Sequence, residues 1–548
     1  MVAHVPPPSP TTRRWAPSSV APEYRPTGGV YRSRRPTVTP LYPVVQHHLE
    51  TFLAASAEAD PAGWGVPESV EKDFRSYLEC GVLAFGFARI RCGDCGKERL
   101  LAFSCKGRGV CPSCNARRMA EVAAHLTDHV FPHLPIRQWV LSLPKRLRPF
   151  LHGSPEVAST VLAVFMRALR ATLRRASPTA PVDSEIGAVS FPQRFGNSLN
   201  PHYHFHVLAV DGVLSEAPPT AANAATDGPA DVQFYEAAWF GPEHSEELAR
   251  LVQHRVLRAF RSRGLLADDA AADMLAWQGT GGFSVDASVR IEADDRAGLE
   301  RLVRYCARGP LALERLYAPG GIAALASPDA RLVYRLPGPD PSGRTELWLT
   351  PIELLERLAR LVPPPRIHRH RYHGVLAPHA RLRSVVIALG RPMLEEPGLT
   401  RSANGPGGTT VNAASTPVPE PCGTSGSARI SWARLLARIY EVLPLLCPAC
   451  GGEMRILSFI TDPPTVQTIL HHLALPHRPP PLTPARAPPQ AELDFDQTSA
   501  LPSLRSGEPA GHEIACQEDL GPHGFDPSDP EPLPDPDFNQ SPPGHWDA

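Results

Sequence analysis

The stretch Asn200-Pro201-His202-Tyr203-His204-Phe205-His206-Val207-Leu208 alternates polar and apolar side chains. This two-residue period predicts a β-strand whose histidines share one face while its apolar side chains pack into a core from the other. Neighbouring histidines on such a face stand about 7 Å apart at the backbone, so two imidazoles can bind one ion. His202 and His206 are nearly twice as far apart, so we do not expect all three histidines to share one metal. The better pair is His204 and His206, on either side of Phe205. A polar, half-exposed strand face without a metal would produce the same pattern.

Strand-like and helix-like patterns alternate on both sides of this stretch. Apolar runs typical of strands cover residues 137–143, 187–191, 203–210 and 283–291, and helical spacing recurs near 155–175, 244–263, 294–307 and 351–361. Residues 136–395 are therefore expected to form one domain of mixed strands and helices.

One of these helices carries a tyrosine among arginines. Asp294-Asp295 is a plausible helix start, after which Leu299, Leu302, Val303 and Cys306 recur as a stripe that would be buried. The same periodicity places Arg301, Arg304, Tyr305 and Arg308 on the other side. A phenol that attacks a phosphodiester needs a basic field and guanidiniums that hold phosphate oxygens. An ordinary solvated arginine-rich face is the alternative.

Two cysteine pairs precede this region. Fifteen residues separate the pair Cys92 and Cys95 from the pair Cys111 and Cys114, a spacing that can close a tetrahedral zinc site. Cys105 lies between the pairs and could replace one ligand, as could His125 or His129. A site closed by four thiolates leaves no position for substrate, so its expected role is structural.

Two further features are a group of arginines beside the first cysteine cluster and a third cysteine pair near the C-terminal end. Arg108, Arg117 and Arg118 flank the first cysteine cluster, which suits either phosphate contacts or a solvated basic face. Cys447 and Cys450 form a further knuckle, which His471 and His472 could complete as a metal site or which could be a simple turn.

Composition and charge limit the possible partners and location of the protein. The 548 residues carry a net charge of -1, but residues 491–548 hold thirteen acidic side chains and one basic one, which leaves 54 basic and 43 acidic side chains before them. A basic body favours a polyanionic partner. The sequence has no apolar run that would span a membrane or serve as a signal peptide, so a cytoplasmic protein with reduced cysteines is expected.

Proline-rich stretches suggest the domain boundaries. We expect a disordered basic arm over 1–40, a zinc- and DNA-binding domain over 41–135, and the domain with the histidine strand over 136–395. A linker over 396–430, a small unit over 431–475 built as helix, knuckle and helix, and a disordered acidic tail over 476–548 would follow.

Five ordered stretches resemble the rolling-circle transposases of the insertion-sequence ninety-one family, whose nuclease domain is an HUH (His, hydrophobic, His) endonuclease. They are RCGDCGKERLLAFSCKGRGVCPSCNARRMAE, FPQRFGNSLNPHYHFHVLAVDG, RYCARGPLALERL, PPPRIHRHRYHGVLAPHARLR and CPACGGEMRILSFITDP. The similarity runs from about Tyr42 to Leu475. It implies an α+β fold with an HUH-type antiparallel sheet and flanking helices, preceded by a small Cys-rich zinc-binding domain.

The resemblance also implies the chemistry. His204 and His206 would hold Mg²⁺ or Mn²⁺, with Gln193 as a third ligand, and Tyr305 would attack single-stranded DNA to form a 5′-phosphotyrosine. Structural Zn²⁺ would occupy the first cysteine cluster. No P-loop is present, which fits strand transfer without a nucleotide cofactor.

Arg301 stands where some family members have a second tyrosine one helical turn before the nucleophile. Either two subunits of a homo-oligomer then share the two cleavages, or a DNA 3′-hydroxyl performs the second transfer. A plasmid relaxase or replication initiator of the same chemistry, and a non-catalytic zinc-dependent DNA-binding protein such as an inactive transposase copy, are the alternative functions.

Overall fold

The computed structural model describes residues 35–217, 231–238, 240–277, 279–340, 342–390 and 447–486. Residues 1–34 of the expected arm, the whole expected linker over 396–430 and the expected tail beyond residue 486 lie outside the described residues. The first helix expected in the small C-terminal unit, before residue 447, also lies outside them. Within the described part, no helix is both long and apolar enough to span a bilayer.

The histidine strand lies inside a six-stranded sheet in which every paired strand is antiparallel to its neighbour. The strand order is β13-β4-β5-β3-β8, and β9 also pairs with β3. The strands are β3 (Ile136–Ser142), β4 (Gly187–Phe195), β5 (Pro201–Val210), β8 (Ser284–Asp286), β9 (Arg290–Ile291) and β13 (Arg371–Gly374). The antiparallel sheet expected for this chain is confirmed, although the expected run 283–291 is two short strands.

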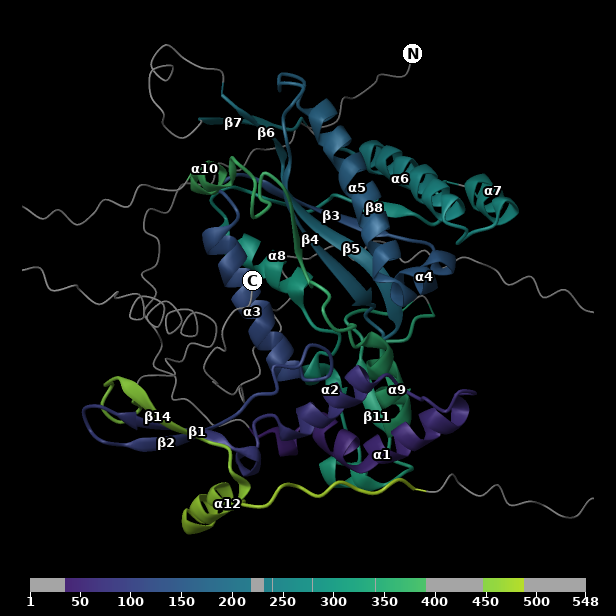
Figure 1. Ribbon diagram of the computed structural model, residues 1–548. Helices are drawn as coiled ribbons and strands as arrows, with labels where there is room; N and C mark the ends of the chain where they lie inside the picture. Colours follow the sequence, from purple (N-terminus) through teal and green to yellow (C-terminus); the bar gives the residue numbers. More distant parts are fainter. Residues whose placement is uncertain are drawn as a thin grey trace, which may run out of the picture.

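Helices cover both faces of this sheet (Figure 1). The face that carries Tyr203, Phe205 and Val207 packs on α5 (Pro155–Ala176), α6 (Pro242–Ser262) and α7 (Asp268–Ala276). The opposite face packs on α3 (Pro112–His129), α8 (Arg296–Ala307) and α10 (Arg383–Ala388). The predicted alternation of β5 is therefore confirmed, since its apolar and histidine faces lie on opposite sides of the sheet.

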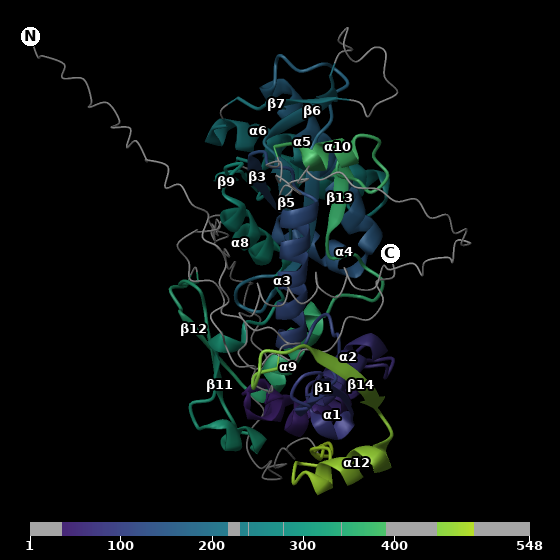
Figure 2. The same cartoon turned by 90° about the vertical axis from the view of Figure 1, so that its left-hand side faces the viewer.

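A second core lies beside the sheet and joins segments far apart in the sequence. It unites α1 (Leu41–Ala59) and α2 (Glu68–Glu79) with α9 (Pro351–Leu361) and with a small sheet, β10 (Leu316–Tyr317), β11 (Leu332–Arg335) and β12 (Glu346–Leu349). Figure 2 shows α3 running from these N-terminal helices up to the large sheet. The single domain expected over 136–395 is corrected, because residues 311–361 bury their apolar side chains against α1 and α2 rather than in the large sheet's core.

The C-terminal segment packs on the N-terminal part of the chain. In Figure 1, β14 (Met454–Ile460) lies beside β1 (Phe87–Cys92), which also pairs with β2 (Glu98–Ala102), and α12 (Pro463–His472) follows. The separate unit expected over 431–475 is thus corrected: a strand follows the knuckle, and that strand completes an N-terminal sheet.

Residues 481–486, expected to belong to a disordered tail, lie along α1. Gln46 Nε2 donates to the Pro481 carbonyl at 2.8 Å, and His47 Nδ1 lies 2.7 Å from Thr483 Oγ1. The expectation is corrected here because a proline-rich segment with no core of its own still offers carbonyls and hydroxyls to another element's side chains.

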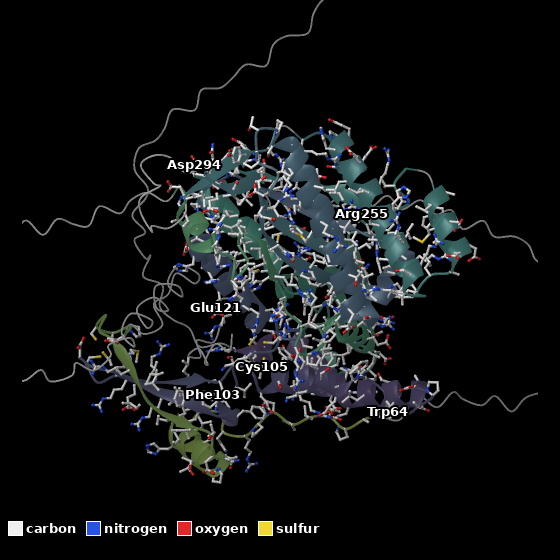
Figure 3. All side chains as sticks on the ribbon, turned by 45° about the horizontal axis from the view of Figure 1, so that its top comes forward. Trp64, Phe103, Cys105, Glu121, Arg255 and Asp294 are labelled. Carbon is white, nitrogen blue, oxygen red and sulfur yellow. The ribbon has the colours of Figure 1, made fainter. Side chains whose placement is uncertain are left out.

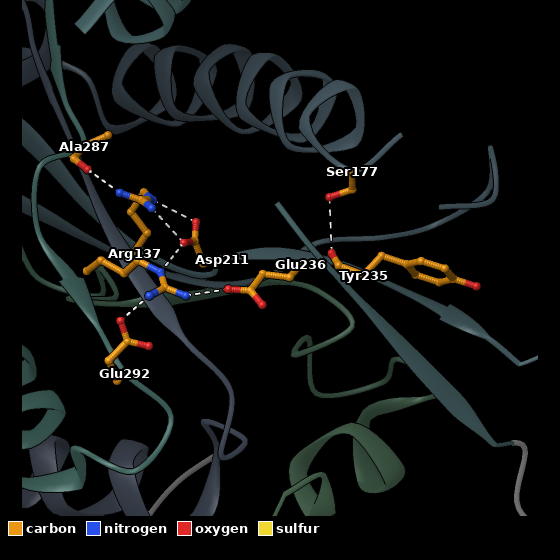
Figure 4. Close-up of polar contacts among 8 residues, drawn as sticks. Arg137, Ser177, Asp211, Tyr235, Glu236, Ala287 and Glu292 are labelled. Atoms are coloured by element: carbon orange, nitrogen blue, oxygen red, sulfur yellow. Dashed lines mark hydrogen bonds and ion pairs between the residues drawn. The ribbon is translucent and has the colours of Figure 1, made fainter. Parts of the chain in front are cut away.

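A buried ion cluster ties strands of the large sheet together at one end. Figure 4 shows Arg137 of β3 bound to Asp211. Arg290 of β9 binds the same carboxylate. Arg137 makes a bidentate contact at 2.8 and 2.8 Å, and Arg290 Nε donates at 2.7 Å. Asp211, only 1% exposed, lies between β5 and β6 (Gly212–Glu216), which pairs with β7 (Val232–Glu236).

Short elements complete the described part of the chain. They are α4 (Arg148–Gly153) and the 3-10 turns η1 (Pro36–Val38), η2 (Leu83–Phe85), η3 (Lys145–Leu147), η4 (Leu313–Arg315) and η5 (Ile322–Ala326). The helices expected near 155–175, 244–263, 294–307 and 351–361 correspond to α5, α6, α8 and α9 and are confirmed.

Candidate active site and thiolate clusters

Two histidines of β5 meet through their rings. The Nε2 atoms of His204 and His206 lie 3.1 Å apart. Burial lowers the pKa of His204 to about 4 and that of His206 well below its ordinary range, so both rings are neutral. Two ligands at right angles, about 2.1 Å from an octahedral cation, would lie about 3 Å apart. The pair therefore fits the cis positions of one hard divalent cation.

The neighbouring strand supplies a partner for one ring. Gln138 of β3 is buried, and its side-chain amide nitrogen lies 2.9 Å from Nδ1 of His206. Because Gln138 and His206 come from paired strands, the register of the sheet fixes this contact. An outer partner of this kind holds a histidine's orientation and tautomer.

Tyr305 reaches the same place from α8. Asp295 caps this helix by accepting from Gly298 N at 2.7 Å, which confirms the predicted start. The Tyr305 ring stands perpendicular to that of His206, with 5.5 Å between centroids. Arg308 covers Tyr305, its Cζ lying 4.6 Å from the ring centroid.

The hairpin between β4 and β5 holds Arg308. Nη2 of Arg308 donates to Asn197 Oδ1 at 3.1 Å, and Arg357 of α9 donates to the Ser198 carbonyl at 3.0 Å. Leu199, fully buried in this hairpin, has a left-handed backbone with φ of 53°. Strain of this kind survives only where the surroundings enforce it, as they do at ligand sites.

The histidines, Tyr305 and Arg308 line one cavity of about 270 Å³. Further polar groups in its wall include Ser142, Lys145, Arg148, Asn197, His202, Asp286, Asp340 and Arg344. Sequence reasoning missed Lys145, Arg148 and Asp286, because isolated charges on separate elements carry no spacing signal. His202 also lines this cavity, and burial with nearby cations lowers its pKa to about 2.

Gln193 of β4 stands opposite His204 in the sheet register. Its Nε2 donates to the backbone carbonyls of Tyr305 at 3.2 Å and Cys306 at 2.9 Å, which ties β4 to the end of α8. Its buried Oε1 has no hydrogen-bond partner among the described residues.

The first thiolate cluster gathers around the start of α3. The Sγ atoms of Cys80, Cys105, Cys111 and Cys114 all lie within 4.8 Å of one another. The Sγ atoms of Cys80 and Cys114 lie 3.7 Å apart, and those of Cys105 and Cys114 lie 3.5 Å apart. Four sulfurs about 2.3 Å from one zinc ion lie about 3.8 Å apart, so these residues fit tetrahedral zinc. In Figure 3 the labelled Cys105 lies beside the N-terminal helices, below Glu121 of α3.

Comparison with protein families reveals what these sites belong to. A family model described as "Transposase zinc-binding domain" matches residues 44–143, and one described as "Putative transposase" matches residues 187–383. The chain belongs to the insertion-sequence ninety-one family of transposases. The second match contains both histidines and Tyr305, and the first contains Cys80, Cys105, Cys111 and Cys114. No curated protein and no solved structure matched the transposase.

The zinc ligand set expected for this transposase is corrected. Cys92 and Cys95 do not join Cys111 and Cys114, but cluster with Cys447 and Cys450, again within 4.8 Å of one another. Cys105, which the sequence allowed as a replacement ligand, and Cys80, which stands outside every C-x2-C pair, take the two places assigned to Cys92 and Cys95. His125 and His129 lie on later turns of α3, and neither described cluster includes them; His471 and His472 are likewise outside the second cluster.

The arginines expected to bind DNA differ in their surroundings. Arg308 lines the cavity, whereas Arg301 and Arg304 do not, and Arg304 binds Glu300 one turn earlier at 2.8 Å. Arg117 binds Glu121 at 2.6 Å. Of the three arginines expected on the same helical face as Tyr305, only Arg308 lines the cavity that contains Tyr305.

Arg108 and Arg118 gather with a third arginine near the zinc-binding domain. Arg369 donates to Asn115 Oδ1 at 3.0 Å, and burial with Arg118 and Arg108 nearby lowers its pKa to about 10. Three like charges close together favour an anionic ligand. Arg369 lies between α9 and β13. In the sequence, only the basic and aromatic residues around it could have marked it as a candidate DNA contact.

Proposed function

We propose that this transposase cuts single-stranded DNA and transfers the cut strand through a 5′-phosphotyrosine on Tyr305, with Mg²⁺ or Mn²⁺ held by His204 and His206. The convergence of these three residues with Arg308 in one cavity carries the proposal. The rings of His206 and Tyr305 contact each other edge to face, with centroids 5.5 Å apart, and both line the cavity in which a phosphate would lie. Oε1 of Gln193, buried and unpartnered among the described residues, is the proposed third protein ligand.

The reaction follows from the residues of the cavity. The phenolic oxygen of Tyr305 attacks the scissile phosphorus, a P–O bond to the tyrosine forms, and the P–O3′ bond breaks. The phenolic proton is lost and the departing 3′ oxygen gains one, so the cleavage balances. When bound, the cation would neutralise charge on the phosphate oxygens. Arg308 would hold the same oxygens through its guanidinium.

Strand transfer is the reverse reaction with a new partner. A 3′-hydroxyl attacks the phosphotyrosine, the phosphodiester forms again and Tyr305 is released. The phosphotyrosyl bond conserves the energy of the phosphodiester, so no nucleotide cofactor is required. Because Arg301, and not a second tyrosine, stands one turn before Tyr305, either two subunits share the two cleavages or a DNA 3′-hydroxyl performs the second transfer.

DNA outside the cavity would follow its basic groups. Lys145 and Arg148 line the cavity with Arg308, and Arg108, Arg118 and Arg369 gather beside the first thiolate cluster. Guanidinium and ammonium groups of this kind bind the phosphate backbone without reading sequence. We propose that these two groups contact the same strand.

The test uses the full chain with Mn²⁺ and labelled single-stranded DNA from the element's ends, with covalent adducts detected on a denaturing gel and mapped by mass spectrometry. An adduct on Tyr305 is expected, lost with chelator and in Tyr305→Phe. Tyr317→Phe is the matched control, because Tyr317 is 41% exposed and stacks on Arg335. An adduct unchanged in Tyr305→Phe, or none on any end sequence despite tight binding, would overturn the proposal.

A further inference from the structure

Four cysteines from opposite ends of the chain form the second thiolate cluster. Cys92 ends β1 and Cys95 lies in the turn before β2, whereas Cys447 and Cys450 precede β14. Their closest sulfurs are 3.4 Å apart between Cys92 and Cys450 and 3.4 Å apart between Cys95 and Cys447. We infer that the chain binds two zinc ions, and that the second is held by these four residues and fastens segment 447–486 to the N-terminal part of the chain.

The two cysteine pairs are built as matching knuckles. Cys92 N donates to the Lys97 carbonyl at 2.9 Å, and Cys447 N donates to the Gly452 carbonyl at 2.8 Å, so both turns close over five residues. A glycine with a left-handed backbone follows each second cysteine: Gly96 has φ of 71° and Gly451 has φ of 75°. Other residues rarely adopt this conformation.

The pair Cys111 and Cys114 has a different local structure. Cys111 is the residue before α3, and Cys114 lies in the first turn of that helix. The knuckle of Cys92 and Cys95 therefore has its structural counterpart at Cys447 and Cys450. Two such knuckles supply the four ligands of a zinc ribbon, whose sulfurs would stand about 3.8 Å apart around the ion.

Burial alone does not account for this cluster. Cys95 and Cys450 are exposed, so they are not apolar filling for a core. Among the described residues, the core beneath them contains Ile90, Cys92, Cys447 and Met454. A unit this small seldom folds on apolar burial and usually needs a metal or disulfides.

The rest of the C-terminal segment follows from this attachment. Beyond the knuckle, β14 pairs with β1 from Met454 opposite Cys92 to Ile460 opposite Phe87. Val466 and Leu470 of α12 then pack on Phe87, and Thr483 reaches His47 of α1. An ion that closes the long loop between Cys95 and Cys447 would lower the entropic cost of all these contacts.

This inference is independent of the proposed nuclease chemistry. Cys447 and Cys450 lie outside both matched stretches, 44–143 and 187–383. The zinc-binding domain therefore contains one complete cluster and half of another. The second half comes from a segment that begins more than three hundred residues later.

The first experiment measures the zinc content of the purified full chain by inductively coupled plasma mass spectrometry. We expect two zinc ions per wild-type chain and one per chain of Cys447→Ser/Cys450→Ser. The control variant Cys306→Ser should still bind two, because Cys306 is buried but belongs to neither cluster. One ion per wild-type chain, or two in the double variant, would overturn the inference.

A second measurement remains informative if a variant loses stability. Cysteines are alkylated in the native full chain and mapped by peptide. In Cys92→Ser/Cys95→Ser we expect Cys447 and Cys450 to react at least tenfold faster than in wild type, while Cys105 stays protected. Equal rates in both proteins, or a disulfide from Cys92 to Cys450 in protein kept with reductant, would refute the shared zinc.

Discussion

The side-chain amide of Gln138 lies 2.9 Å from Nδ1 of His206, on the side of the ring away from His204. As placed, the amide nitrogen faces Nδ1, and the amide oxygen has no hydrogen-bond partner among the described residues. Turned over so that its oxygen faces Nδ1, the amide would accept the ring proton and leave the Nε2 lone pair for a cation. The two strands that carry the residues are paired, so the geometry is set by the sheet rather than by a loop.

We therefore predict that Gln138→Leu weakens binding of Mn²⁺ by about ten- to hundredfold, as loss of an outer partner does at other metal sites. Titration calorimetry on the full chain measures the affinity. Gln138→Glu is the control, because a carboxylate can still accept from Nδ1–H and should retain most of the affinity. Equal affinity in Gln138→Leu and wild type would remove Gln138 from the site.

Arg308 and Arg301 provide a matched pair for the cleavage step. Arg308→Ala is expected to slow formation of the DNA adduct by about a hundred- to thousandfold, because it removes a cation placed at the developing phosphate charge. Arg301→Ala, one helical turn before Tyr305 and outside the cavity, should slow it by less than about threefold. Single-turnover kinetics at saturating DNA separate this effect from binding. Similar losses in both variants would show that the arginines act only through general charge.

The Asp211 cluster should control the stability of the sheet. Asp211→Ala leaves Arg137 and Arg290 without their shared carboxylate, and removing one partner of a buried pair costs about 3 to 5 kcal/mol. Asp273→Ala breaks the exposed pair with Arg146, where the cost is about 0 to 1 kcal/mol. Urea unfolding followed by circular dichroism measures both. A loss below about 1 kcal/mol for Asp211→Ala would contradict the assignment.

Asp73 should govern how tightly zinc is held in the first cluster. Its carboxylate accepts from the backbone of Arg108 at 3.3 Å, Gly109 at 3.1 Å and Val110 at 2.6 Å, and so shapes the loop between Cys105 and Cys111. Asp73→Ala is expected to speed zinc release to a chromophoric chelator by roughly tenfold or more.

The control for this prediction is Glu71→Ala on the same helix. Glu71 pairs with Arg75 at the surface and does not contact the cysteine loop, so its loss should leave the release rate unchanged. If Asp73→Ala also releases zinc at the wild-type rate, the loop is held by the metal alone.

Local patterns determined much of this transposase from its sequence. Period-two alternation predicted β5 and its two faces, because a strand's side chains point alternately to either side whatever the surroundings. Helical spacing predicted α8, its buried stripe and its start at Asp295 for the same local reason. The rise of a strand limited a converging pair to neighbouring histidines of that face, and the structure has the Nε2 atoms of His204 and His206 3.1 Å apart.

The partition of the cysteines was decided only by the tertiary structure. C-x2-C spacing identifies a knuckle but not its partner, because any two knuckles can share an ion once the chain brings them together. Here β14 pairs with β1 and carries Cys447 to Cys95, while α2 delivers Cys80, which has no paired cysteine nearby in the sequence, to Cys111 and Cys114. The cavity likewise required long-range packing. Gln138, Arg148 and Asp286 meet the histidines only because the sheet's register and the surrounding helices place separate elements around one point.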